Sequence, residues 1–125
     1  MVLVDTSIWI RFLSKRGPSA KELDRLLEME VVCGHELVYG ELLIGDPGGR
    51  LPVLALFRRL QQSPLVPHDA VVSLVRTRKF HGRGAGWIDI HLVASALASG
   101  HQFWTADSDL LSIARELGIA YELKN

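Results

Sequence analysis

Two acidic residues come just after apolar runs that are typical of buried strands. Asp5 directly follows Val2–Val4, and Asp107 follows the pair Phe103 and Trp104 after a short spacer. A charged carboxylate is costly to bury without a partner, so neither acid suits the core. Parallel α/β sheets bind ligands beyond the carboxyl ends of their strands, and both acids are expected there.

Two further acids interrupt apolar stretches that have a helical pattern. Glu41 lies in "VYGELLIG" and Asp89 in "GWIDIHLVASAL", while Lys and Arg are absent from residues 31–49 and 84–114. Carboxylates that converge without bases repel one another, and a divalent cation removes this penalty. Oxygen ligands favour Mg²⁺ or Mn²⁺. We expect Asp5, Asp89 and Asp107 to hold the metal, and Glu41 to ligate it or to position an attacking water.

Each acid also has a purely structural interpretation. Asp89 would suit the positive end of a helix dipole, and Asp107 could cap the helix that follows it. Glu36 and Asp46 are interpreted in this way, as an exposed first-turn charge and a turn residue. The joint arrangement of acids after two strands and on two helices favours the metal site.

The elements that must position these acids alternate along the chain. Short strands are predicted at residues 2–4, 31–33, 65–66, 102–105 and 119–121. Helices are predicted at residues 6–14, 19–30, 35–45, 51–62, 68–80, 88–99 and 107–117, the second opened by a capping box of Ser19 and Glu22. This order predicts a single α/β domain over residues 1–125, with a small, mainly parallel sheet flanked by helices.

The composition agrees with one globular domain in a reducing compartment. Hydrophobic residues make up 48% of the 125 residues, and a single cysteine excludes an internal disulfide and a cysteine-rich zinc site. Asp5 interrupts the apolar run that a signal peptide would need, and no run is long enough to span a bilayer. We therefore expect a cytoplasmic protein.

The charges are unevenly distributed although the formal net charge is zero. Residues 50–83 contain seven basic residues against one acid, Asp69. A cluster within this segment is a candidate for contacts with RNA phosphates, although basic residues also suit the end of a helix. Its members are Arg76, Arg78, Lys79 and Arg83.

Taken in order, "VDTSIWI", "ELLIG", "WIDIHLVASAL" and "TADSDL" resemble the four acidic motifs of PIN-domain nucleases, and most closely those of the small VapBC-type ribonuclease toxins. The resemblance extends over nearly the whole chain. It implies a PIN fold, cleavage of RNA with Mg²⁺ or Mn²⁺, a homodimer and a cognate antitoxin.

Residue by residue, the acidic positions of the family match Asp5, Glu41, Asp89 and Asp107. Ser7 and Thr105 match hydroxyl positions that would orient ligands or waters around the metal. Asp109 falls where many relatives also carry an acid, so the choice between Asp107 and Asp109 stays open at this point.

Other functional classes share some of these sequence features. A PIN module that binds RNA without cleaving it would not need the complete acidic set, and a housekeeping PIN nuclease would lack an antitoxin. A phosphorelay receiver would need an acidic pair after its first strand, where this chain has a single acid, Asp5. Acid–base cleavage by two of the five histidines is disfavoured because no pair of them has a meaningful spacing.

Overall fold

The structure is a computed structural model that describes residues 1–15 and 17–123, apart from the side chain of Leu51. Within this part of the chain, seven α-helices surround four β-strands. The strands are β1 (Val2–Val4), β2 (Val32–Gly34), β3 (Gln61–Gln62) and β4 (Gln102–Trp104). The helices are α1 (Thr6–Leu13), α2 (Gly17–Glu28), α3 (Glu36–Ile44), α4 (Leu51–Arg58), α5 (His68–Arg78), α6 (Trp87–Ser99) and α7 (Ser108–Glu116).

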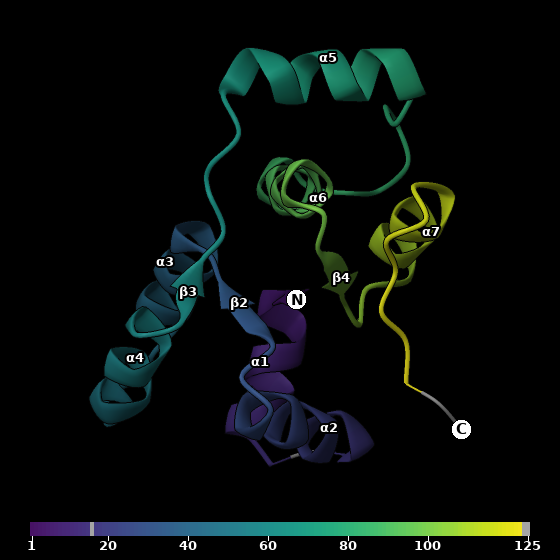
Figure 1. Ribbon diagram of the computed structural model, residues 1–125. Helices are drawn as coiled ribbons and strands as arrows, with labels where there is room; N and C mark the ends of the chain where they lie inside the picture. The colour runs from purple at the N-terminus through teal and green to yellow at the C-terminus, as the bar shows by residue number, and fades with distance from the viewer. Residues whose placement is uncertain (16, 124–125) are drawn as a thin grey trace.

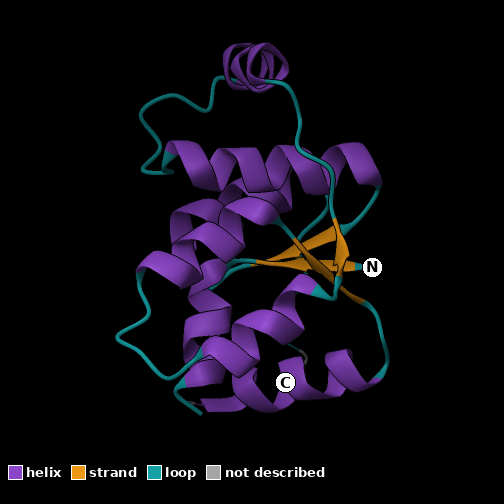
Figure 2. Cartoon of the chain, turned by 90° about the vertical axis from the view of Figure 1, so that its left-hand side faces the viewer, coloured by secondary structure: helices purple, strands orange, loops and turns teal. Residues whose placement is uncertain are grey.

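The strands form one parallel sheet in the order β3-β2-β1-β4. Helices cover both faces, with α5 and α6 stacked on one side and α1 and α2 on the other (Figure 1). Seen from the side, the sheet is the middle of three layers (Figure 2). The expected α/β fold with a parallel sheet flanked by helices is confirmed.

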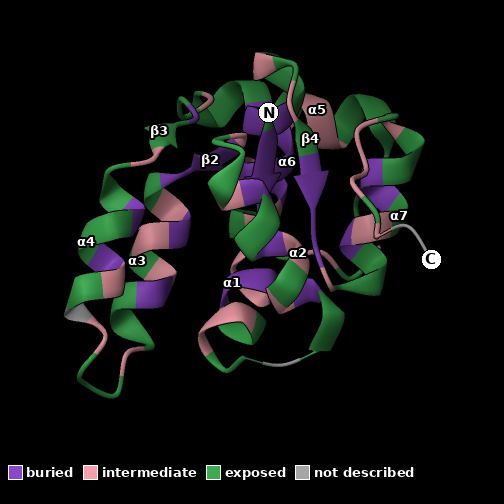
Figure 3. Ribbon diagram, turned by 60° about the horizontal axis from the view of Figure 1, so that its bottom comes forward, coloured by how far each residue is buried: buried purple, intermediate pink, exposed green. Residues whose placement is uncertain are grey.

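Burial follows from the central position of β1. Its three residues are all buried, as expected of a parallel strand covered on both faces. Phe103 and Trp104 of β4 are buried beside it, whereas the outer faces of α2, α4 and α5 are largely exposed (Figure 3). Val4 pairs with Trp104, so β1 and β4 end at the same edge of the sheet.

The predicted capping box at Ser19 is wrong. Helix α2 begins at Gly17, and Ser19 is a buried residue inside it. Gly17 and Pro18, a pair that is also typical of the end of a helix, open α2 instead. Proline is tolerated in the first turn of a helix because its missing N–H is not needed there, and Pro18 lies in that turn.

Two other boundaries also differ from the prediction. Helix α4 ends at Arg58, and the edge strand β3 is the polar pair Gln61–Gln62, so the strand expected at residues 65–66 is wrong. The last predicted strand is reduced to one bridge between Phe103 and Ala120. No helix of the described residues is long and apolar enough to cross a membrane.

Candidate active site

Asp5 lies at the carboxyl end of the central strand and is only 4% exposed. Its Oδ1 accepts a hydrogen bond from the backbone N–H of Thr6 at 2.8 Å, so Asp5 caps α1. Its Oδ2 accepts from the hydroxyls of Ser7, at 2.8 Å, and Thr105, at 2.7 Å. A carboxylate has about four lone-pair directions, so about one is left, on Oδ1, for a further partner.

The two hydroxyls join the loop after β1 to the loop after β4. Each donates its proton to Asp5, and each accepts a backbone N–H from the second loop. Ser7 Oγ accepts from Ala106 at 3.1 Å, and Thr105 Oγ1 accepts from Asp107 at 3.0 Å. Because all of these roles are used, the orientation of the Asp5 carboxylate is fixed before any ligand binds.

Glu41 reaches the same region from α3. Its Oε1 accepts a hydrogen bond from Thr6 Oγ1 at 2.7 Å, and α1 packs on α3. Thr6 directly follows Asp5 in the chain, so this hydrogen bond holds the Glu41 carboxylate near Asp5. The second oxygen of the Glu41 carboxylate accepts no hydrogen bond from the described residues, and the side chain is half-buried.

Asp89 shows the strongest electrostatic effect in the region. Burial raises its pKa to about 6, and the negative charges of Asp5 and Glu41 raise the pKa as well. The charge of Asp107 contributes in the same direction, against a lowering by the backbone hydrogen bond from Gly86. The other three acids are therefore all near enough to Asp89 for their charges to act on it.

The raised pKa of Asp89 predicts how the stability of the metal-free protein depends on pH. In the unfolded chain this pKa returns to about 3.8, so the folded protein binds the proton more tightly. That stabilisation is complete below about pH 4 and is lost as the pH rises to about 6. We expect about 1–2 kcal/mol, allowing for the solvent that still reaches this half-buried carboxylate.

Urea unfolding in EDTA between about pH 4 and pH 7 would measure this effect. Asp89→Asn should lack this component of the pH dependence. Equal pH slopes for the variant and the wild type would contradict the electrostatic interpretation.

The structure places Asp107 and Asp109 differently. Asp107 Oδ1 accepts from the Leu110 backbone N–H at 2.9 Å and caps α7, and its charge acts on Asp89. Asp109 instead lies against the glycine loop, where a Cβ on Gly84 would come within 2.5 Å of Asp109 Oδ2. Gly84 also has φ of +87°, which favours glycine. Of the two acids, Asp107 is the better placed for the pocket.

The donor set has the chemistry of a hard divalent cation site. It consists of carboxylate oxygens, and no described Lys, Arg or His forms an ion pair with any of the four acids. The acids do not form a closed cage, because no three His, Cys, Asp or Glu side chains in the described ranges converge closely enough. Carboxylate oxygens are nevertheless the type of ligand that Mg²⁺ and Mn²⁺ prefer, and a cation between these acids would offset their mutual repulsion.

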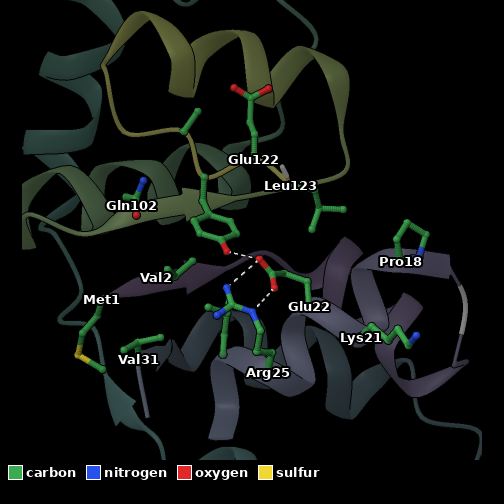
Figure 4. A pocket seen from close by; sticks show the side chains of 13 residues that line it. Met1, Val2, Pro18, Lys21, Glu22, Arg25, Val31, Gln102, Glu122 and Leu123 are labelled. Carbon is green, nitrogen blue, oxygen red and sulfur yellow. Dashed lines mark hydrogen bonds and ion pairs between the residues drawn. The ribbon is translucent and has the colours of Figure 1, made fainter. Parts of the chain in front are cut away.

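A wide depression of about 1220 Å³ lies at the opposite, amino-terminal end of the strands. Within it, Glu22 accepts hydrogen bonds from Arg25 and from Tyr121 (Figure 4). Met1 and Gln102 line its floor near the starts of β1 and β4. It lacks the acidic set and gives no reason to place the active site there.

The basic cluster of the sequence divides into two parts. Arg76, Arg78 and Lys79 are exposed at the end of α5. Arg83 is bound to α7, where its guanidinium pairs with Glu116 and donates to Ser112 at 3.1 Å.

Three residues with roles in this region were not predicted from the sequence. Thr6 holds Glu41, and the buried pair His35 and Ser95 joins α3 to α6. His35 precedes α3 at the N-cap position, where Ser, Thr, Asp or Asn is usual. A histidine at this position could have indicated a capping role. Partners 35 and 60 residues apart in the chain give no local signal.

Comparison with known proteins agrees with this geometry. The family model of the PIN domain matches residues 2–116. Ribonuclease VapC32 of Mycobacterium tuberculosis strain ATCC 25618 / H37Rv is 42% identical over 121 residues, which cover 96% of this chain and 95% of that protein. The same values hold for Ribonuclease VapC32 of strain CDC 1551 / Oshkosh. The chain therefore belongs to the PIN-domain family and is VapC-like along nearly its whole length, as the four acidic motifs predicted.

Proposed function

We propose that this protein is a metal-dependent endoribonuclease and the toxin of a type II toxin–antitoxin pair. The observation that carries the proposal is the 42% identity over 96% of this chain to proteins of the VapC type. The raised pKa of Asp89 agrees with it, because burial and three further carboxylates act on a side chain that has no basic partner among the described residues. Its relatives are named ribonucleases, which supports RNA as the substrate. A PIN module that only binds RNA would not need this costly acidic set.

In this proposal, Asp5, Asp89 and Asp107 would hold the cation, with Asp5 using Oδ1. When bound, Mg²⁺ or Mn²⁺ would supply the positive charge that favours ionisation of a water and attack on the scissile phosphate. Glu41 would orient the attacking water through the carboxylate oxygen that Thr6 leaves free. Ser7 and Thr105 would keep the Asp5 carboxylate in place throughout.

The direct test is cleavage of RNA by the purified chain, in Mg²⁺, in Mn²⁺ and in EDTA. We expect cleavage with either cation and none in EDTA, and products with a 5′-phosphate and a 3′-hydroxyl. Mapping cleavage ends in cellular RNA would identify the target. Cleavage that persists in EDTA would contradict the metal requirement, and RNA binding without cleavage would favour the non-catalytic module.

The exposed basic residues predict a salt-dependent contribution to RNA binding. Arg76→Gln combined with Lys79→Gln should weaken binding and reduce the slope of log K against log salt by about 1.4, because each lost phosphate contact with a single strand reduces it by about 0.7. Binding titrations at several salt concentrations measure this slope. Arg83→Gln is the control, since Arg83 is already paired with Glu116, and it should change the slope less.

An unchanged slope in the double variant would leave these cations with a structural role at the end of α5. That role is the favourable interaction of basic side chains with the carboxyl end of a helix.

An apolar groove supports the antitoxin part of the proposal. The groove has a volume of about 730 Å³, and its apolar lining comes mainly from α1, α2 and α4. Leu56 in this lining is 60% exposed, so the groove offers apolar surface that a partner could cover. The apolar lining residues of the three helices include Trp9, Phe12, Leu27, Val53, Leu56 and Phe57, and Leu60 lies just after α4.

An amphipathic segment of a small antitoxin would fit such a groove. Helix α1 connects the groove to the acidic pocket, because Thr6 and Ser7 lie at its start and Trp9 and Phe12 lie further along. A basic side chain of the bound segment would then compete with the cation for the carboxylates. A homodimer and a cytoplasmic location complete the proposal, in line with the family resemblance.

A further inference from the structure

A buried hydrogen bond joins two of the helices that carry the carboxylates. His35 precedes α3, Ser95 lies within α6, and both residues are fully buried. The distance from His35 Nε2 to Ser95 Oγ is 2.9 Å. Helix α3 carries Glu41 and packs on α1 and α4, whereas α6 carries Asp89 and packs on α5, α7 and the sheet. The bond is therefore a direct polar link between helices that otherwise pack on different neighbours.

The second contact of His35 fixes the position of its proton. The backbone N–H of Leu37 donates to His35 Nδ1 at 3.1 Å, so this nitrogen is the acceptor and the ring caps α3. The proton of the neutral ring is then on Nε2, which donates to Ser95 Oγ. Burial lowers the pKa of His35 to about 4, with a contribution from His91, so the ring is neutral near pH 7.

The link lies the same number of residues from each carboxylate along the chain. Glu41 comes six residues after His35, and Asp89 comes six residues before Ser95, which is about 9 Å along each helix. Thr6 holds Glu41 beside the end of β1, and α6, which carries Asp89, packs on β1, so both acids belong to the same region of the fold. The charge of Glu41 also raises the pKa of Asp89. A shift between α3 and α6 at the hydrogen bond would change the separation of these two acids if each helix moves as a rigid unit.

We propose that His35 and Ser95 are positioning residues that set the separation of Glu41 and Asp89, and with it the metal affinity of the pocket. This inference rests on the proposed nuclease function and adds to it two residues that contact neither metal nor RNA. A merely structural role would lower the melting temperature only. A positioning role lowers metal affinity in protein that remains fully folded.

The first experiment compares Ser95→Ala with Ser99→Ala, a change at a half-buried serine one turn further along α6. Binding of Mn²⁺ is measured by calorimetry well below the melting temperature, and RNA cleavage is measured in parallel. We expect Ser95→Ala to weaken Mn²⁺ binding about tenfold, the lower end of the range for residues that orient metal ligands. Ser99→Ala should bind Mn²⁺ as the wild type does.

The second experiment separates the two hydrogen bonds of His35. Gln can place its amide nitrogen near the position of Nε2, and Asn can place its oxygen near Nδ1. His35→Gln should therefore keep the bond to Ser95 and the Mn²⁺ affinity, but lose the helix cap and lower the melting temperature by about 5 °C. His35→Asn should keep the cap and bind Mn²⁺ about tenfold more weakly.

Combining His35→Asn with Ser95→Ala should weaken binding no further than either change alone, because both remove the same link. Folded Ser95→Ala and His35→Asn proteins that bind Mn²⁺ as tightly as a binding-competent wild type would overturn the positioning role alone. A wild-type chain that neither binds Mn²⁺ nor cleaves RNA would overturn this inference together with the proposed nuclease.

Discussion

Asp89→Asn should reduce RNA cleavage by about 1000-fold, equivalent to about 4 kcal/mol of the activation barrier. The change keeps the shape of the side chain but removes a charged oxygen ligand, so Mn²⁺ binding should be lost together with cleavage. The metal-free variant should be more stable than the wild type at neutral pH, because burial and neighbouring acids already disfavour the charge on Asp89. Cleavage rates, calorimetry and urea unfolding measure the three effects.

The matched control is Asp69→Asn, an exposed acid in the first turn of α5, as Asp89 is in the first turn of α6. It should leave cleavage and Mn²⁺ binding unchanged. Asp5→Asn should also abolish cleavage, but it should lower stability by about 1–3 kcal/mol, because an amide group would face hydroxyl donors in place of an acceptor. Undiminished cleavage by Asp89→Asn would refute the metal site.

Growth arrest is the second large effect that we expect. Expression of the chain alone in a bacterial host should stop growth, and the Asp5→Asn variant should not. Co-expression of a small antitoxin encoded beside it should restore growth, because the proposed antitoxin would occupy the apolar groove and block the acidic pocket. Colony counts and optical density under inducible promoters measure both results.

A variant in the groove lining tests whether the antitoxin binds there. Leu56→Glu places a charge on the exposed apolar lining of α4, so the antitoxin should fail to restore growth while RNA cleavage persists. Ile10→Glu is the control, because Ile10 is 49% exposed on α1 and is not part of the groove lining. A wild-type chain that is harmless without a partner, although folded and metal-bound, would favour a housekeeping nuclease.

The fold was predictable wherever apolar runs were strong. All residues of Val2–Val4 and of Phe103–Trp104 are buried in the sheet, and such apolar runs are easy to recognise in a sequence. The edge strand Gln61–Gln62 was missed because its exposed, polar side chains carry no apolar pattern. The start of α2 was missed because Gly17 and Pro18 occur both after helices and in first turns.

The acids themselves were predictable because their positions conflict with burial. The hydrogen bonds around the acids could not be predicted from the sequence. The contacts of Thr6 with Glu41 and of His35 with Ser95 depend on how the helices pack. The choice between Asp107 and Asp109 likewise needed three dimensions, because only the fold shows which of them turns toward the glycine loop. The catalytic roles of the acids stay a prediction until the variants are measured.

The hydroxyl of Thr105 that donates to Asp5 belongs to a residue 100 positions further along the chain. A ribosome adds residues from the amino end, so Asp5 leaves the exit tunnel long before Thr105 and Asp107 exist. Contacts between distant parts of a chain also form slowly once both parts are available. A nascent chain therefore passes through most of its synthesis without an assembled acidic pocket, and under the proposed mechanism it would not cleave the RNA of the ribosome that is making it during that interval.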